Sequence, residues 1–147
     1  MRIEKRHVEG RPLTVIVEYP EWNNSVASLI GRIEKMDLSF VGKSEDRSVS
    51  IGISDIYYIE NVERKLFLYT KDEVFRLDGT MPDIESKIPD TGLVRISRTC
   101  IMNTDKLREI KQIRNSHLEA VLDNDEKLIV SRKYLPDIKK VFKKEEV

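Results

Sequence analysis

The chain has 147 residues, of which 39% are hydrophobic, and its 26 basic and 26 acidic side chains give a formal net charge of zero. This composition is enough for a hydrophobic core and excludes wholesale disorder. No apolar run reaches the roughly 20 residues that span a bilayer, the start MRIEKRHVEG lacks the apolar stretch of a secretory signal, and the single cysteine, Cys100, excludes an internal disulfide. We therefore expect a cytoplasmic protein.

The first third of the chain predicts a small strand–helix unit. Residues 13–19, LTVIVEY, are rich in β-branched side chains and are followed by Pro20, which favours a strand. Residues 22–35 follow a helical period, with Asn23 or Asn24 as the N-cap and one apolar face formed by Val26, Leu29, Ile30 and Ile33. The polar stretch at 42–47 predicts a boundary there, between a unit at 1–46 and a domain at 47–147.

From residue 49 onward the chain alternates short apolar runs with turn signals. A helix is predicted at 81–88, because Thr80 can cap it and Pro82 suits its first turn, and a second helix is predicted at 134–141. Strands are predicted at 49–53, 55–60, 66–70, 74–77, 93–96, 100–102, 107–113, 118–122 and 127–130. Many short strands and few helices indicate a mainly β, antiparallel domain.

The charges are distributed unevenly although they cancel overall. Residues 51–93 carry 5 basic and 9 acidic groups, whereas residues 94–147 carry 13 and 9, a net of +4. The basic groups concentrate in two clusters: Arg95, Arg98, Lys106, Arg108, Lys111 and Arg114, and Arg132, Lys133, Lys139, Lys140, Lys143 and Lys144. Such clusters are as typical of a solvated face as of a site for a polyanion, and the pattern leaves both open.

Sequence motifs of catalysis are absent. The chain has no Gly-rich nucleotide loop and no H-E-x-x-H, and with two histidines and one cysteine a tetrahedral zinc site is hard to build. Cys100 lies in an apolar run, which is typical of a buried structural thiol. We expect no enzyme activity, no metal, no cofactor and no small-molecule substrate.

Three segments, in order, resemble the LytTR DNA-binding domain family. They are Asp55-Ile-Tyr-Tyr-Ile-Glu60, then Val94-Arg-Ile-Ser-Arg-Thr-Cys-Ile-Met-Asn103, then Val130-Ser-Arg-Lys-Tyr-Leu135. The resemblance covers about residues 49–142. The middle segment departs from the family pattern at two positions, where the usual histidine is Ser97 and the usual serine is Thr99, which keeps a hydroxyl.

The resemblance implies an elongated antiparallel stack of β-sheets with short helices. In such a domain, loops at one edge insert into the major groove of double-stranded DNA and read the bases. The positions that match the family's contacts are Arg64, Lys65, Arg98, Asn103 and Arg132. The predicted DNA-binding site also includes Ser97, Thr99, Ser131 and Lys133, whose side chains can bind phosphates.

The chemistry of these side chains suits DNA. An arginine can donate two hydrogen bonds to guanine, while hydroxyls and lysines can bind phosphates, with Lys106, Lys111 and Arg114 as further phosphate candidates. Other roles stay open for three of them: Arg98 and Arg132 could be surface arginines that cover apolar area, and Asn103 could be a turn residue that ends a strand.

The resemblance also bears on partners. Many similar proteins carry a receiver domain of roughly 120 residues before the β domain, and about 45 residues precede it here, so we expect a regulator without a receiver. We expect residues 1–46 to support a homodimer, and the resemblance suggests a membrane-bound inhibitor protein as a partner. The alternative function is a β-rich interaction or signalling adaptor that does not bind DNA; on that alternative, Arg98 and Arg132 need not converge with Arg64 and Lys65.

Overall fold

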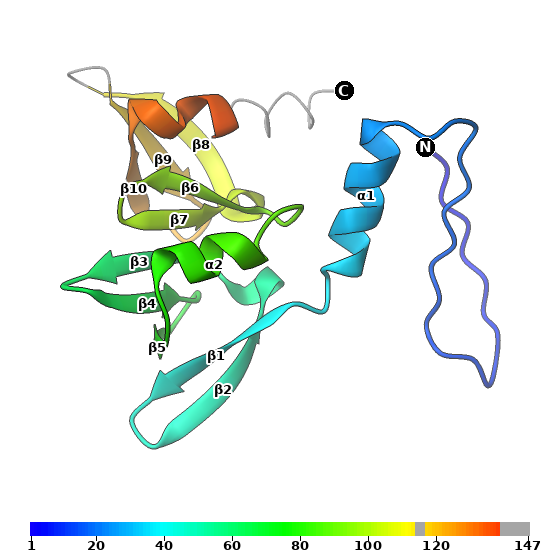
Figure 1. Cartoon of the computed structure of the whole chain (residues 1–147), viewed down its shortest axis with the longest axis horizontal. Coiled ribbons are helices and arrows are strands. Elements are labelled where there is room, and N and C mark those ends of the chain that lie inside the picture. Colours follow the sequence, from blue (N-terminus) through cyan, green and yellow to red (C-terminus); the bar gives the residue numbers. More distant parts are fainter. Residues whose placement is uncertain (114–116, 139–147) are drawn as a thin grey trace.

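The structure is a computed structural model that describes residues 1–113 and 117–138 (Figure 1). Its elements are α1 (Asn24–Glu34), β1 (Ser39–Ser44), β2 (Arg47–Gly52), η1 (Ile53–Asp55), β3 (Tyr58–Val62), β4 (Lys65–Tyr69), β5 (Val74–Leu77), α2 (Met81–Lys87), β6 (Leu93–Ser97), β7 (Cys100–Asn103), η2 (Thr104–Lys106), β8 (Leu107–Gln112), β9 (Leu118–Leu122), β10 (Lys127–Val130) and η4 (Arg132–Tyr134). Each strand predicted from residue 49 onward has a counterpart. Residues 135–138 are helical, and the rest of the predicted last helix lies outside the described residues.

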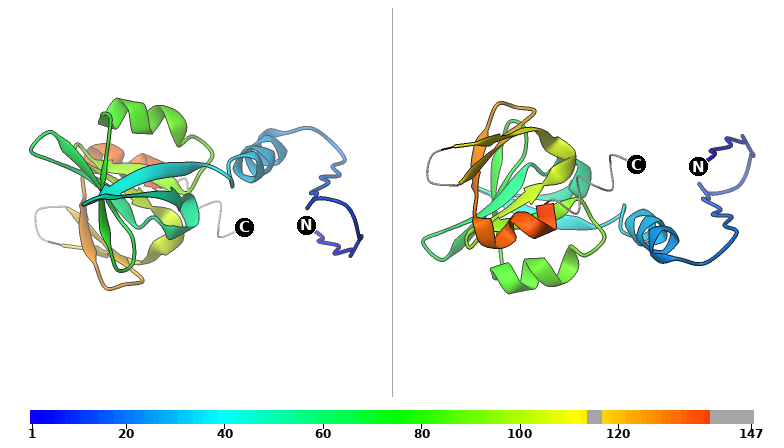
Figure 2. Two further views of the ribbon diagram at one scale, coloured as in Figure 1. Left: turned by 90° about the horizontal axis from the view of Figure 1, so that it is seen from below. Right: turned by 90° about the horizontal axis from the view of Figure 1, so that it is seen from above.

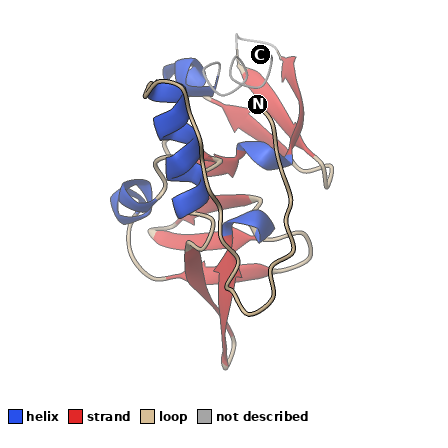
Figure 3. Cartoon of the chain, turned by 90° about the vertical axis from the view of Figure 1, so that its right-hand side faces the viewer, coloured by secondary structure: helices blue, strands red, loops and turns tan. Residues whose placement is uncertain are grey.

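The strands form two antiparallel sheets. One has seven strands in the order β2-β1-β5-β4-β3-β7-β6, and the other has three in the order β10-β9-β8. Figure 3 shows the strands in these two groups. The prediction of a mainly β antiparallel stack with short helices is therefore confirmed.

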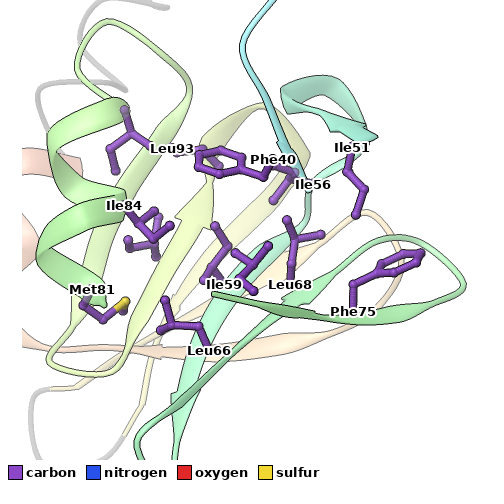
Figure 4. Close-up of a cluster of buried hydrophobic side chains, with 13 residues drawn as sticks. Phe40, Ile51, Ile56, Ile59, Leu66, Leu68, Phe75, Met81, Ile84 and Leu93 are labelled. Carbon is purple, nitrogen blue, oxygen red and sulfur yellow. The ribbon is translucent and has the colours of Figure 1, made fainter. Parts of the chain in front are cut away.

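Strand alternation gives the large sheet two buried faces. On one face, Ile59 and Ile101 pack with Met81 and Ile84 of α2, as Figure 4 shows for the labelled side chains Ile59, Met81 and Ile84. On the other face, Tyr58 and Met102 pack against the three-stranded sheet, where they meet residues such as Leu122. The large sheet is thus the middle of three layers, with α2 on one side and the small sheet on the other.

Buried aromatic rings and the thiol belong to this core. Tyr57, Tyr58 and Phe75 are buried, and the Tyr58 and Tyr69 rings stack with centroids 4.1 Å apart. Cys100 is buried, and desolvation raises the pKa of its thiol to about 12, so it is protonated at neutral pH. This confirms the structural role predicted for Cys100.

Helix α2 begins where the sequence predicted. The Thr80 hydroxyl accepts a hydrogen bond from the Asp83 backbone N–H at 3.4 Å, and the Asp83 carboxylate accepts one from the Thr80 N–H at 2.9 Å. This capping box satisfies two backbone donors, and it lowers the pKa of Asp83 because the charged carboxylate is the acceptor.

Replacing Thr80 with alanine is expected to lower the free energy of unfolding by about 1 kcal/mol, because one N-terminal donor of α2 loses its partner. Urea denaturation followed by circular dichroism measures this change. Thr80→Ser keeps the hydroxyl and is the matched control, expected to stay close to the wild type. Equal stabilities for the alanine variant and the wild type would contradict the role of the cap.

The predicted strand at 13–19 does not form. These residues have no regular secondary structure, and Leu13 and Ile16 are 98% and 80% exposed. A strand needs a neighbour to satisfy its backbone hydrogen bonds, and no strand of the described chain pairs with this segment. The predicted helix is present as α1, which is capped by Asn23, and Figure 2 shows α1 and the preceding segment lying to one side of the β domain.

The expected boundary between residues 46 and 47 coincides with the turn of a β-hairpin. Strand β1 pairs with β2 along its whole length and also with β5, and Phe40 of β1 is buried in the core. Residues 39–44 therefore belong to the large sheet, because long-range pairing, which local polarity does not reveal, places them there.

Candidate nucleic-acid interface

Two hairpin turns of the large sheet lie side by side. Strand β3 leads into the turn of Glu63 and Arg64, and β7 follows the turn of Arg98 and Thr99. Because β3 and β7 are antiparallel neighbours, these turns are at the same end of the sheet. The Asn61 backbone N–H donates to the Thr99 carbonyl at 2.8 Å, which joins them directly.

A third segment reaches this end through a β-bulge. The pairing of β6 with β7 shifts between Arg95 and Ser97, which leaves Ile96 out of the ladder. The Ile96 carbonyl accepts a hydrogen bond from the Ser131 N–H at 2.8 Å. The bulge thus brings residues 131–133 beside the β6–β7 turn.

We call this end of the domain the arginine edge, defined by Glu63–Lys65, Ser97–Thr99 and Ser131–Lys133. In Figure 1 it lies at the left, where the β3–β4 and β6–β7 turns project. The side chains of Arg64, Lys65, Arg98, Arg132 and Lys133 are exposed there. The structure therefore brings together eight of the nine predicted site residues: Arg64, Lys65, Ser97, Arg98, Thr99, Ser131, Arg132 and Lys133.

The β3–β4 turn has an uncommon backbone. Glu63 and Arg64 have φ values of 51° and 67°, and Val62 pairs with Lys65, so the two central residues form a tight hairpin turn with positive φ. Glycine or asparagine is favoured at such positions, and other residues are strained there. This geometry makes Arg64 project from the tip of the hairpin.

Arg95, which the predicted site omitted, organises the β6–β7 turn. Its Nε donates to the Ser97 carbonyl at 2.9 Å, and its terminal nitrogen donates to the Arg98 carbonyl. The guanidinium also forms an ion pair with Glu85 of α2 and lies 5.8 Å from the centroid of the Tyr134 ring. The bulge between Arg95 and Ser97 interrupts the strand alternation, so no local pattern in the sequence marks this role.

The hydroxyl of Ser97 also stabilises the turn. The Ser97 Oγ accepts a hydrogen bond from the Thr99 N–H at 3.3 Å, while the Thr99 side chain is exposed.

Lys133 is exposed, and its Nζ lies 5.5 Å from the centroid of the Tyr134 ring. Tyr134 therefore has two cationic neighbours, Arg95 and Lys133, within the range of cation–π attraction.

Asn103, the ninth predicted site residue, does not lie at the arginine edge. It ends β7 at the opposite end from the β6–β7 turn and is 0% exposed. Its Nδ2 donates to the carbonyls of Ile53 and Ile56 at 3.2 and 2.8 Å, and its Oδ1 accepts from the Asp105 N–H at 3.0 Å. This burial argues against the predicted DNA contact and supports the alternative role, a turn residue that ends a strand.

The structure places two of the three further phosphate candidates, Lys106 and Lys111. The Nζ of Lys106 lies 5.2 Å from the centroid of the Tyr57 ring. Tyr57 directly precedes β3, so Lys106 lies at the opposite end of the sheet from the arginine edge. A hydrogen bond to Asp123, with burial, raises the Tyr57 pKa to about 12 there. Lys111 lies on β8 with its Nζ 3.3 Å from Glu109, and Arg114 lies outside the described residues.

The described part of the chain holds neither a metal-binding cluster nor a membrane-spanning helix. Residues 1–113 and 117–138 contain no group of three or more His, Cys, Asp or Glu side chains placed to hold a metal ion. Within those same ranges, no helix has the length and apolar character needed to cross a membrane.

The chain is similar in sequence and in fold to known DNA-binding domains. The profile of the LytTr DNA-binding domain matches residues 46–143. The sensory transduction protein LytT of Enterococcus faecalis is 34% identical over 97 residues, which are 66% of this chain and 40% of that protein. The transcriptional regulatory protein YpdB of Escherichia coli K12 is 29% identical over 99 residues, which are 67% of this chain and 41% of that protein.

A solved structure has the same fold. The LytTr DNA-binding domain of a response regulator from Bacillus cereus superposes with a TM-score of 0.66 at 20% identity, over 71% of this chain and 95% of that one. The fold and the matched profile define the class as a mainly β DNA-binding domain, which is not a class of enzyme. The chain belongs to the LytTr DNA-binding domain family, and it spans about 40% of the length of the curated relatives that it matches.

Proposed function

We propose that this protein is a transcription regulator that binds double-stranded DNA sequence-specifically and reads bases in the major groove with side chains of the arginine edge. The observation that carries the proposal is that Arg64, Arg98 and Arg132 lie at one end of the domain. The segments that bear them are joined by two backbone hydrogen bonds, from Asn61 to Thr99 and from Ser131 to Ile96. These residues come from three distant parts of the sequence.

The chemistry of this edge divides between reading and anchoring. A guanidinium on a projecting turn can donate two parallel hydrogen bonds to guanine O6 and N7, which is worth roughly 1–3 kcal/mol of discrimination. Lys65, Lys133 and the exposed Thr99 hydroxyl suit phosphates, which fix register without reading sequence. Local cations supply the salt-dependent attraction, so a net charge of zero for the whole chain does not oppose DNA binding.

The rival proposal, an adaptor that binds an acidic protein without binding DNA, does not require three arginine-bearing segments to converge. Their convergence, together with membership of a DNA-binding family, favours DNA. The regulatory names of the relatives belong to longer proteins, so regulation by this chain is part of the proposal.

We further infer a homodimer that binds two half-sites about one helical turn apart, because a two-fold protein matches a repeated site. A cytoplasmic location and a membrane-bound inhibitor protein remain predictions of the same scheme. Cofactors and small-molecule substrates play no part in it.

The test is a selection from random-sequence duplexes, followed by fluorescence-anisotropy titrations of the selected duplex and an unrelated duplex at two salt concentrations. We expect tight binding of the selected duplex, with affinity for both duplexes falling as salt rises. Folded protein that enriches no sequence and binds neither duplex would overturn the proposal.

Arg95→Ala is expected to weaken binding to the selected duplex on the order of tenfold, while binding to unrelated DNA changes little. Arg95 holds the carbonyls of Ser97 and Arg98, and charge-assisted hydrogen bonds of this kind contribute roughly 1.5–3 kcal/mol. Without them, Arg98 must be ordered on binding, which costs affinity. The same anisotropy titrations measure the ratio of the two affinities.

Arg108→Ala is the matched control for Arg95→Ala. Arg108 is exposed and pairs with Asp125 at 2.7 Å, at the opposite end of the small sheet from Ser131. Its removal costs the same charge without touching the turn. An equal loss of affinity on both duplexes in Arg95→Ala would mean that Arg95 binds phosphate itself, which contradicts the positioning role.

A further inference from the structure

The chain before α1 forms an exposed arm. Nearly all of residues 1–23 are exposed, and Leu13 and Ile16 present almost their whole side chains to solvent. No backbone hydrogen bond joins residues 13–19 to any other residue in the described part of the chain. In Figures 1 and 2 the arm lies on the far side of α1 from the sheets, away from their edges.

The arm is self-complementary about Ile16. If two copies are placed antiparallel with Ile16 facing Ile16, Val15 faces Val17, Leu13 faces Tyr19 and Thr14 faces Glu18. Every apolar residue then faces an apolar one, and no like charges are opposed. One step beyond the prolines, Arg11 of each copy faces Glu21 of the other, which adds two opposite-charge pairs.

We propose that residues 11–21 of two copies of this chain pair as antiparallel strands about a two-fold axis through Ile16. The partner that covers the arm is thus a second copy, and the contact is isologous, with each residue meeting its symmetry counterpart. This inference rests on the homodimer of the proposed function and assigns its interface.

The two prolines support this register. Hydrogen-bonded and non-hydrogen-bonded pairs alternate along an antiparallel ladder. Pro12 and Pro20 each lie four residues from Ile16, so they fall on the same kind of pair as Ile16 does. Because proline has no N–H, that kind is the non-hydrogen-bonded pair, and the residues between the prolines keep all the donors that the ladder uses.

The paired strands have an apolar face that α1 can cover. Leu13, Val15, Val17 and Tyr19 alternate onto one face, so two copies present eight apolar side chains there. A bare two-stranded ribbon is only marginally stable in water. Helix α1 begins at Asn24, shortly after Tyr19, and its half-buried stripe of Val26, Leu29, Ile30 and Ile33 is close enough along the chain to pack on that face.

Cysteine cross-linking tests the register directly. The Cα atoms of a non-hydrogen-bonded antiparallel pair are about 4.5 Å apart and those of a hydrogen-bonded pair about 5.5 Å, and both lie in the range of disulfides. Ile16→Cys is expected to form a disulfide-linked dimer on mild oxidation. Val15→Cys and Val17→Cys are expected to cross-link when mixed and only weakly when each is alone. The wild type is the control, since its only thiol, Cys100, is buried.

Two outcomes would overturn the inference. One is a failure of Ile16→Cys to cross-link, and the other is cross-linking of Val15→Cys alone as efficiently as in the mixture, which indicates a parallel or random contact. Light scattering of Ile16→Lys adds a second readout: two opposed lysines should convert a dimer to a monomer at about 10 µM, since like charges face each other. A wild type that is itself monomeric at that concentration also overturns the inference.

DNA binding separates this inference from the proposed function. Ile16→Lys is expected to bind a duplex with a single half-site as the wild type does, because the arm is remote from the arginine edge, and to lose the gain in affinity on a double site. Loss of cross-linking with intact half-site binding refutes only the interface. If the Ile16→Cys dimer cross-links as expected but binds no half-site, only the DNA proposal is refuted.

Discussion

Replacing both Arg98 and Arg132 with alanine is expected to abolish the preference for the selected duplex while weak, salt-sensitive binding to DNA of any sequence persists. Each bidentate contact to guanine is worth roughly 1–3 kcal/mol, and each 1.4 kcal/mol is about tenfold in affinity. The double variant should therefore lose on the order of a hundredfold or more on the selected duplex. Anisotropy titrations of both duplexes measure the loss.

A matched control separates base reading from loss of charge. Lys71→Ala/Arg108→Ala removes the same two charges from exposed positions at the other end of the molecule, Lys71 in the β4–β5 turn and Arg108 at the start of β8. This control should keep the preference. The base-reading role is refuted if the control and the arginine variant lose affinity equally, or if the arginine variant still discriminates between the duplexes.

The single variants locate the bases that are read. Arg98→Ala and Arg132→Ala should each relax the preference at a different position of the selected site, because the two side chains come from different segments of the arginine edge. Repeating the selection with each variant reveals these positions. Both variants relaxing the same position would contradict separate contacts.

Asn103→Leu is expected to lower the free energy of unfolding by about 2–4 kcal/mol, the largest stability effect that we predict. Leucine is close to asparagine in size, so packing is largely kept, but the carbonyls of Ile53 and Ile56 and the N–H of Asp105 lose their partner. Each buried polar group left without a hydrogen bond costs roughly 1–3 kcal/mol, although the costs do not simply add. Urea denaturation measures the change.

Asn24→Ala is the control for Asn103→Leu, since Asn24 is an exposed residue of α1, and its replacement should change stability by no more than about 0.5 kcal/mol. If Asn103→Leu proved as stable as Asn24→Ala, the three hydrogen bonds would not be holding η1 and η2 to the sheet. A loss of DNA preference in an Asn103→Leu variant that is as stable as the wild type would instead restore the predicted DNA contact.

Part of the arginine edge could be predicted from the sequence alone. The motifs that resemble the family pointed to Arg98 and Arg132, and the turn after Glu60 pointed to Arg64 and Lys65, so the exposed cations of the edge were predicted. Arg95 was missed as its organiser, because its partners include Glu85 on α2 and the ring of Tyr134, and such contacts depend on tertiary packing. The burial of Asn103 was not predicted, because a buried and an exposed asparagine look alike in a sequence.

The sequence by itself determined what local signals specify: the alternating strands from residue 49, the start of α2 at Thr80, and membership of a β-rich family. Only the tertiary structure decided which segments meet. The bulge at Ile96 brings Ser131 to the edge, and β1 joins the large sheet across the expected boundary. The segment at 13–19 has every local mark of a strand and forms none in the single chain, because a strand is completed by a hydrogen-bonding neighbour, which residue preferences cannot supply.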